Sequence, residues 1–339
     1  MKKIPEDWIR IKTIESHAAG EPLRVIVEGY PEIKGKTILE KRRYVKENLD
    51  NFRKILMFEP RGHADMYGAL LVEPEREDSD IGVIFMHNEG YSTMCGHGII
   101  AMTKVLLDMG IIEKNGDSVE LKIDTPAGLV ISRTERKNGR VDKISFVNVP
   151  SFVYLKDGKT EVEGLGSVEY DIAFGGAFYA FVDANKLGLE LNPEEYNKII
   201  EFGKKIKNKI ASEVKIEHPF SEDLGFLYGT IFVGKAKNPE NHSRNVCVFA
   251  EGEVDRSPTG TGVSARASIH YFKGDIKLGE ELKIESIIGT VFSVKPLREV
   301  KFGDFKAIIP EVSAKAYITG ESEFFLDPDD PLKEGFIFR

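Results

Sequence analysis

The sequence of 339 residues predicts an α+β protein made of two similar halves. The main evidence is an internal repeat, because the segments that begin at Tyr67 and Tyr228 match at an offset of 161 residues. Each half also mixes strand-like and helical segments. A period near half the chain is far longer than the roughly 20–50 residues of a solenoid unit, which indicates one duplicated domain. We expect an N-terminal half over residues 1–155 and a C-terminal half over residues 160–339, and leave open that terminal strands cross between them.

Alternating apolar and polar residues predict five matching strands in each half. In the first half these strands cover residues 23–27, 69–72, 82–86, 119–123 and 129–132. In the second half they cover residues 178–182, 230–233, 245–249, 282–285 and 290–294. The linker between the halves is expected within residues 152–166.

An amphipathic helix is expected near the front of each half. The first begins after Thr37, which forms a capping-box pattern with Glu40 and precedes apolar residues at helical spacing as far as Leu56. The second follows Asn192 and Pro193, a pair typical of a helix start.

A different kind of helix follows Cys95 and Thr259. Each begins with glycines and ends at another glycine fifteen residues after the cysteine or threonine, at Gly110 and Gly274. The helix after Cys95 is apolar on nearly every face, so other elements must surround it, and we expect these to be strands. The repeat therefore predicts two buried helices with a polar side chain at each N-terminus.

Composition excludes several classes of function. The net charge of −8 argues against nonspecific binding to nucleic acid or to an anionic membrane surface. The first ten residues contain no apolar signal segment and no run approaches about 18 apolar residues, so we expect a cytoplasmic protein. Two cysteines are too few for a disulfide framework, and no dinucleotide fingerprint or phosphate-binding loop occurs.

The two helix N-termini suggest a site for a small amino acid. At such a position the helix dipole and free amides lower the pKa of a cysteine, which favours the Cys95 thiolate. Amides at Gly96 and at residues 260–261 can bind a carboxylate, and Asp255 is a natural partner for the ammonium group. The Cα would then lie between Cys95 and Thr259. Removing its proton requires a base and stabilisation of the carbanion.

Other residues with chemical potential allow more than one interpretation. His97, in the first helical turn, suggests a site role, although a buried core histidine is the alternative. Cys247 lies in an apolar strand and is interpreted as a small buried hydrophobe. His63 and Asp65 resemble a metal-ligand pair, but without a second cluster they indicate a loop or part of a substrate cleft, so no metal is expected. His17 is another candidate for the cleft.

The motif residues resemble those of the proline racemase family. The matches are Met-Cys-Gly-His-Gly at 94–98, Asp-Arg-Ser-Pro-Thr-Gly-Thr-Gly at 255–262, and shorter segments at 20–24, 59–62, 125–128 and 327–331. The resemblance implies a diaminopimelate-epimerase-like fold with two pseudo-symmetric domains. Each would have a curved, mostly antiparallel sheet wrapped around a central helix, with the site in the cleft. It also implies catalysis without metal, pyridoxal phosphate or nucleotide.

The resemblance further assigns roles to particular residues. It implies that His97 and Asp255 contact the substrate nitrogen. The groups that would bind the carboxylate are backbone amides, those of Gly96, His97, Gly260 and Thr261. Tyr67 and Phe249 match the aromatic walls around the substrate ring.

One position departs from the racemase pattern. Proline racemases and 4-hydroxyproline 2-epimerases carry cysteine at both catalytic places, whereas this chain has Cys95 and Thr259. A hydroxyl is far less acidic than a thiol and is a poor proton donor for racemisation. The branch with threonine resembles trans-3-hydroxy-L-proline dehydratases. In that substrate the Cα hydrogen and the hydroxyl share a ring face, so one group on that face could remove the proton and assist the departure of water.

The expected reaction is therefore cofactor-independent dehydration of an imino acid to Δ1-pyrroline-2-carboxylate. Two rivals stay open, namely a proline or hydroxyproline epimerase and an imino-acid-binding protein without catalysis. The thiol argues against the second, because binding alone does not require one. A small imino acid is the expected partner, and a homodimer is left open.

Overall fold

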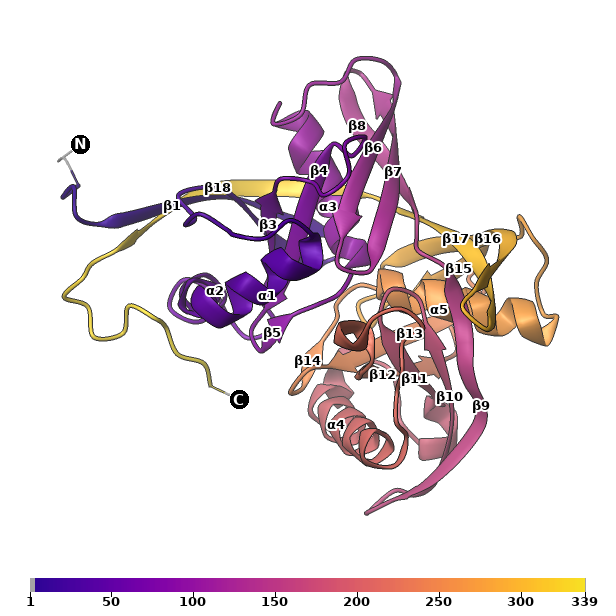
Figure 1. Cartoon of the computed structure of the whole chain (residues 1–339). Coiled ribbons are helices and arrows are strands. Elements are labelled where there is room, and N and C mark those ends of the chain that lie inside the picture. Colours follow the sequence, from indigo (N-terminus) through magenta and orange to yellow (C-terminus); the bar gives the residue numbers. More distant parts are fainter. Residues whose placement is uncertain (1–3, 339) are drawn as a thin grey trace.

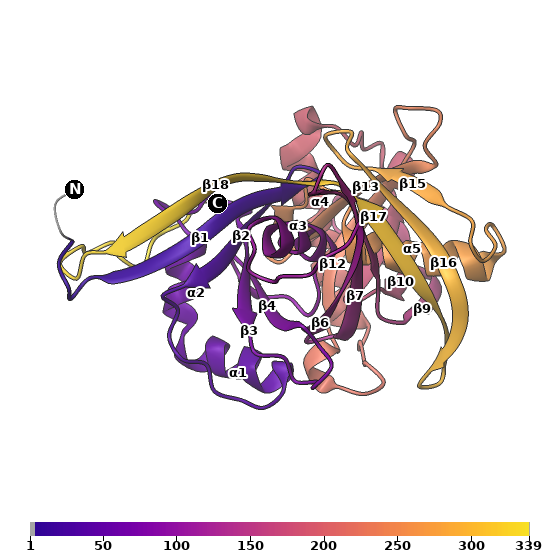
Figure 2. The same cartoon turned by 90° about the horizontal axis from the view of Figure 1, so that it is seen from above.

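Each half of the molecule is a curved sheet that surrounds one buried helix (Figure 1). The computed structural model describes residues 4–338. The central helices are α3 (Gly96–Asp108) in the N-half and α5 (Gly260–Lys273) in the C-half. In Figure 2, α3 is seen within a ring of strands. Eleven of its 13 residues are buried, as the apolar sequence of this helix predicted.

The two sheets repeat the same order of strand pairings. In the N-half the series is β2 (Glu21–Glu28), β3 (Tyr67–Val72), β4 (Ile81–His87), β6 (Ser118–Thr125), β7 (Gly128–Lys137) and β8 (Arg140–Val147). In the C-half it is β11 (Phe178–Asp183), β12 (Leu227–Gly234), β13 (Ser243–Phe249), β15 (Leu282–Glu285), β16 (Val291–Phe302) and β17 (Phe305–Ala314). Both series pair parallel, antiparallel, parallel, antiparallel and antiparallel. The predicted fold class is confirmed, and all ten predicted strands are present.

The two halves exchange their edge strands. β1 (Ile9–Ala18) pairs with β2 and with β18 (Ala316–Leu326), which comes from the far end of the chain. The equivalent β10 (Gly166–Phe174) pairs with β11 and with β9 (Ser151–Val162). β17 also pairs with β8 and β9, so the two sheets are joined. Short strands β5 (Gly90–Tyr91) and β14 (Glu253–Val254) precede the two central helices.

The linker predicted within residues 152–166 is wrong, because β9 and β10 form an antiparallel hairpin there. The polar residues that suggested a linker lie on the solvent side of β9, whereas Thr160 and Val162 are buried. A strand with one exposed face contains many polar residues, so its composition resembles that of a linker.

The outer helices cover the far faces of the sheets. α1 (Ile38–Asn48) begins with the predicted capping box between Thr37 and Glu40. The single helix expected there is wrong, because Leu49 has a non-helical φ of −131° and separates α1 from α2 (Asp50–Met57).

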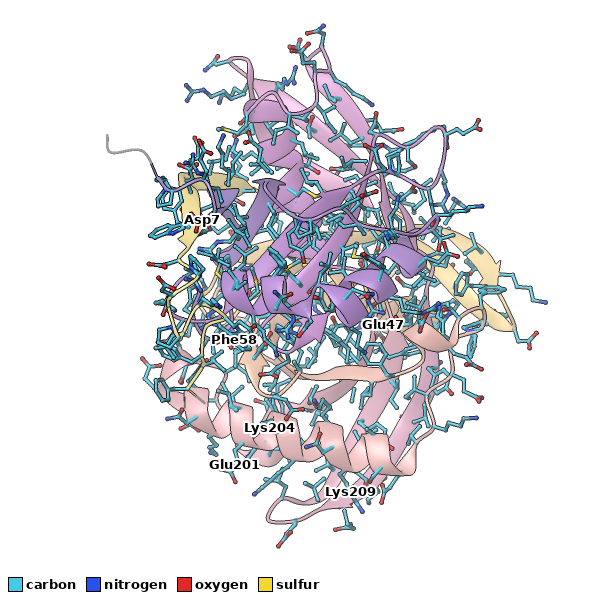
Figure 3. All side chains as sticks on the ribbon, turned by 60° about the vertical axis from the view of Figure 1, so that its left-hand side comes forward. Asp7, Glu47, Phe58, Glu201, Lys204 and Lys209 are labelled. Carbon is cyan, nitrogen blue, oxygen red and sulfur yellow. The ribbon has the colours of Figure 1, made fainter. Side chains whose placement is uncertain are left out.

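In the C-half, α4 (Tyr196–Glu213) buries Ile199, Ile206 and Ile210, while Glu201, Lys204 and Lys209 lie on its outer side (Figure 3). Short 3-10 helices η1 (Ala184–Leu187), η2 (Pro193–Glu195) and η3 (Glu222–Leu224) flank it, and Asn192 caps η2 rather than α4 itself. None of the helices in residues 4–338 combines the length and apolar character needed to cross a bilayer.

Candidate active site

The N-termini of α3 and α5 touch each other at two glycines. A Cβ placed on Gly96 would lie 2.5 Å from the Cα of Gly260, and a Cβ on Gly260 would lie 2.5 Å from the Cα of Gly96. Only glycine permits this approach. The sequence predicted that the amides of these glycines bind a carboxylate, and the structure gives the glycines a second role, which is to let the two helices approach closely.

A small, nearly closed cavity lies at this junction. It brings together all nine residues that the sequence singled out, namely Tyr67, Cys95, Gly96, His97, Phe249, Asp255, Thr259, Gly260 and Thr261. Three residues that sequence reasoning did not select also line it, namely Met94, Tyr179 and Tyr228. A signal existed for Tyr228, because it is the repeat equivalent of Tyr67.

Cys95 is the N-cap of α3, and its sulfur points back to the first helical turn. Sγ accepts a hydrogen bond from the Gly98 amide at 3.2 Å and lies 3.2 Å from Nδ1 of His97. Burial raises the pKa of the thiol well above its ordinary value, while hydrogen bonds from the Gly98 amide and the Tyr67 hydroxyl oppose that rise. The expectation of a lowered pKa is therefore wrong for this closed arrangement, because desolvation outweighs the helix terminus.

His97 lies between the cysteine and the aromatic wall. Its ring packs edge-on against Tyr67 with centroids 4.8 Å apart. Burial lowers the pKa of the imidazole, although Asp255 opposes that effect. The neutral imidazole and the neutral thiol are consequently the favoured forms of this pair.

Thr259 is the N-cap of α5 but is oriented differently from Cys95. Its φ of +68° lies in the left-handed region, which a β-branched residue rarely adopts. Its methyl group is directed toward Gly262, in the place where the Cys95 sulfur faces Gly98. Oγ1 is buried, and within residues 4–338 it has no hydrogen bond of ordinary geometry. Strain of this kind is concentrated at functional sites, where the surrounding structure maintains it.

Cys247 is fully buried in β13, in agreement with its interpretation as a buried hydrophobe. The structure adds that it lies beside the Asp255–Thr259 segment, because its carbonyl accepts the Asp255 amide at 3.1 Å. Burial raises the pKa of its thiol well above the ordinary value, and contact with the Thr259 hydroxyl partly lowers it. A second thiol therefore lies next to Thr259.

The carboxylate of Asp255 is held by the loop that carries it, since Oδ1 accepts the Ser257 amide at 2.7 Å. Behind it, the buried Glu21 accepts the Arg256 amide at 2.6 Å. Burial, followed by the charge of Asp255, raises the pKa of Glu21 well above its usual range. The Arg256 side chain forms an ion pair with Asp65 of the other half. The carboxylate of Asp65 thus belongs to the framework of the cleft.

The remaining histidine candidates lie elsewhere. Nδ1 of His63 is 2.6 Å from the carbonyl oxygen of Ala64, and Nδ1 of His17 accepts the Gly20 amide at 3.2 Å. Neither side chain lines the cavity formed by the described residues.

Aromatic rings form one wall of the cavity. Tyr228 and Phe249 stack with centroids 5.3 Å apart and an interplanar angle of 12°. The Tyr67 hydroxyl hydrogen-bonds the Ser92 hydroxyl and lies 3.4 Å from the Tyr228 hydroxyl. The Tyr179 hydroxyl forms a hydrogen bond with Thr261 Oγ1 at 2.7 Å, in which either oxygen can be the donor. The wall is therefore apolar in its faces and carries hydroxyl groups at its edge.

Two helix N-termini, one thiol and one carboxylate around a small cavity define an enzyme site for a small substrate that carries a carboxylate. The proline racemase family model matches residues 13–337, and the chain belongs to this family.

Comparison with individual proteins gives a finer picture. The chain is 50% identical to a trans-3-hydroxy-L-proline dehydratase of Colwellia psychrerythraea, over 98% of this chain and 94% of that protein. It is 44% identical to the human trans-3-hydroxy-L-proline dehydratase, over 97% and 95% of the two chains. Among solved structures, it matches a hydroxyproline epimerase from Agrobacterium vitis with bound trans-4-hydroxy-L-proline at 28% identity and a TM-score of 0.94. That match covers 98% of this chain and 96% of the epimerase.

Proposed function

We propose that this protein dehydrates trans-3-hydroxy-L-proline to Δ1-pyrroline-2-carboxylate and water. The observation that carries the proposal is the asymmetry of the two helix N-termini, because one cavity is lined by the thiol residue Cys95 at one N-terminus and by Thr259 at the other. Racemisation requires a proton donor on each ring face, whereas syn elimination requires one active face only. Relatives with 44–50% identity over nearly the whole chain carry the name of this dehydratase.

In the proposed complex the substrate is held at both charged ends. The carboxylate would receive the amides of Gly96 and His97 from α3 and those of Gly260 and Thr261 from α5. Asp255 and His97 would contact the ring nitrogen, and the Asp255 carboxylate is already oriented by the Ser257 amide. Tyr67 and Phe249 would enclose the ring. Amides directed at the carboxylate would also stabilise the negative charge that develops when the Cα proton leaves.

Cys95 would act as the base. His97 Nδ1 lies 3.2 Å from Sγ, and the base is the fraction of Cys95 that has lost its thiol proton. The resulting thiolate removes the Cα proton, and the electron pair forms the Cα–Cβ double bond. The C3–O bond breaks as a proton, replaced on the enzyme by the one taken from Cα, passes to the leaving oxygen and forms water. The enamine product then tautomerises to Δ1-pyrroline-2-carboxylate. Thr259 would face the opposite side of the ring, from which nothing departs.

The proposal also covers the setting of the enzyme. A cytoplasmic location fits the two unpaired cysteines, which a reducing compartment would preserve. A homodimer is kept open, and sedimentation of the purified protein would test it.

The decisive experiment uses two substrates. The protein is incubated with trans-3-hydroxy-L-proline and, separately, with L-proline, while ketimine formation and optical rotation are followed. We expect ketimine from the first substrate and no inversion of the second. The structural likeness to a hydroxyproline epimerase makes epimerisation the rival outcome. Inversion of L-proline or of a hydroxyproline without ketimine formation would establish the rival, and binding without turnover would exclude both reactions.

A further inference from the structure

Dehydration requires a group that racemisation does not, because the departing hydroxyl must receive a proton. Hydroxide is a poor leaving group, and a positioned general acid typically contributes about 10²–10⁴-fold to such a step. Cys95 alone would have to serve as base and acid in turn. The hydroxyl groups along the edge of the cavity wall are therefore the place to look for an acid.

The Tyr67 hydroxyl shares the cavity with the cysteine. It is one of the influences that lower the pKa of the Cys95 thiol, and the Tyr67 ring packs against His97, whose Nδ1 lies 3.2 Å from the sulfur. The same hydroxyl contacts Ser92 Oγ and lies 3.4 Å from the Tyr228 hydroxyl. Ser92 is fully buried and can donate its own proton to the phenolic oxygen, which leaves the phenolic hydrogen free to point into the cavity.

The side chain of Tyr67 is also fixed in place. It is buried, its ring stacks against His87 with centroids 5.7 Å apart, and it meets His97 edge-on. Burial raises the pKa of the phenol well above its usual value, and the neighbouring Cys95 and Tyr228 add to that rise. The phenol consequently keeps its proton until an acceptor of higher basicity, such as a departing hydroxide, is present.

We propose that the Tyr67 hydroxyl is the general acid that protonates the departing hydroxyl group, and that Cys95 then restores the phenolic proton. This inference rests on the proposed dehydratase function. The Cys95 thiolate takes the Cα proton, and the Cα–H electron pair becomes the double bond. The C3–O bond breaks while the phenol gives its proton to that oxygen, which forms water. The thiol proton passes to the phenolate within the same cavity, so thiolate and phenol are both regenerated without any further reactant.

Because Tyr67 and Cys95 line the same cavity, the proposal puts both on the ring face from which the Cα proton departs. Trans-3-hydroxy-L-proline carries its hydroxyl on that same face. The relay therefore accounts for syn elimination with one active face, and gives Tyr67 a chemical role beyond that of an aromatic wall.

The test compares elimination with proton exchange in Tyr67→Phe, which retains the ring and removes only the hydroxyl. In deuterated water, the rate of ketimine formation and the deuterium content of recovered trans-3-hydroxy-L-proline are measured together. We expect dehydration to fall by at least about 10²-fold, as for loss of a general acid. Exchange at Cα should persist, because Cys95 still removes and returns the proton. The ratio of exchange to elimination should therefore rise by a similar factor.

A second substrate separates acid catalysis from positioning. Trans-3-fluoro-L-proline releases fluoride, which does not depend on a proton donor as hydroxide does. Tyr67→Phe should slow fluoride release far less than it slows dehydration. Tyr170→Phe, at a buried tyrosine outside the cavity, is the matched control and should leave both rates unchanged. Tyr228→Phe tests the neighbouring hydroxyl and should leave the exchange-to-elimination ratio near that of the wild type.

Each outcome is decisive. Equal losses of exchange, dehydration and fluoride release in Tyr67→Phe would show that Tyr67 only positions Cys95, which overturns the inference. Unchanged dehydration would overturn it as well, and so would the expected pattern found in Tyr228→Phe instead. If the wild type forms no ketimine, the proposed function itself fails, and that result is obtained before any variant is made.

Discussion

Replacing Gly96 with alanine should separate the two central helices. The added Cβ would lie 2.5 Å from the Cα of Gly260, whereas ordinary contacts begin at 3.4 Å. The helix N-termini must therefore move apart by about 1 Å, and a misplacement of that size can reduce catalysis about 10²-fold. Overpacking costs about 1–3 kcal/mol. The better helix propensity of alanine offsets about 1 kcal/mol of that. We expect stability to change little and activity to change much.

The assay measures kcat/KM for ketimine formation together with the urea midpoint of unfolding. Gly260→Ala should behave like Gly96→Ala, because the contact is mutual. Gly320→Ala is the control, since a Cβ there meets nothing within 4 Å. Gly96→Ala with more than a tenth of wild-type kcat/KM would refute the argument that helix contact sets the catalytic geometry.

Four further predictions follow from the site and its surroundings. Cys95→Ser should reduce the rate of dehydration by at least about 10²-fold. Calorimetry should show that the variant still binds pyrrole-2-carboxylate, a planar analogue of the carbanion. Activity above a tenth of the wild type would contradict the assignment of Cys95 as the base. Thr259→Cys should gain L-proline racemisation, measured by polarimetry. The assay is run under reducing conditions because Cys247 lies beside the new thiol and could form a disulfide with it. Racemisation no faster than that of the wild type would contradict the prediction. Because burial raises the pKa of Cys95, the reactive thiolate is favoured at higher pH, so kcat/KM should rise with pH; a profile that is flat between about pH 6 and 9 would argue against a thiolate base. Burial would raise the pKa of Glu285, but hydrogen bonds to its carboxylate outweigh burial and lower the pKa to about 2. The carboxylate therefore stabilises the fold at pH values above its unfolded pKa near 4.5, and this stabilisation is lost as the pH falls toward 2. Glu285→Gln should lower the free energy of unfolding by about 3 kcal/mol at neutral pH in urea titrations and have less effect in acid.

The two helix N-termini that line the cavity could be predicted from sequence because their signals are local. Cys95 and Thr259 each stand immediately before a glycine-rich helix start, and the repeat relates the two positions. Helix N-termini require particular residues within a few positions of each other, so the chain displays them without knowledge of the fold. The same locality made the capping box at Thr37 predictable.

Other properties depend on residues that are distant in the sequence. The raised pKa of Cys95 results from burial by both halves together, including the charge of Asp255. The 3.4 Å contact between the hydroxyls of Tyr67 and Tyr228 depends on how the two halves pack together. The positive φ of Thr259 is imposed by its surroundings against its own preference. No pattern within a short window contains this information.

The exchange of β9 and β18 affects how the protein is made. β18 pairs with β1 across ten positions, so the sheet around α3 is complete only after residues 316–326 have left the ribosome. Until then the nascent chain carries an apolar helix whose enclosing sheet is unfinished. β9, by contrast, is synthesised before every strand of the sheet that it completes. The sheet around α3 therefore cannot close until β18 has been made, although α3 itself is made much earlier. Pairing over such sequence separation is intrinsically slow, so we expect this sheet to close late in folding.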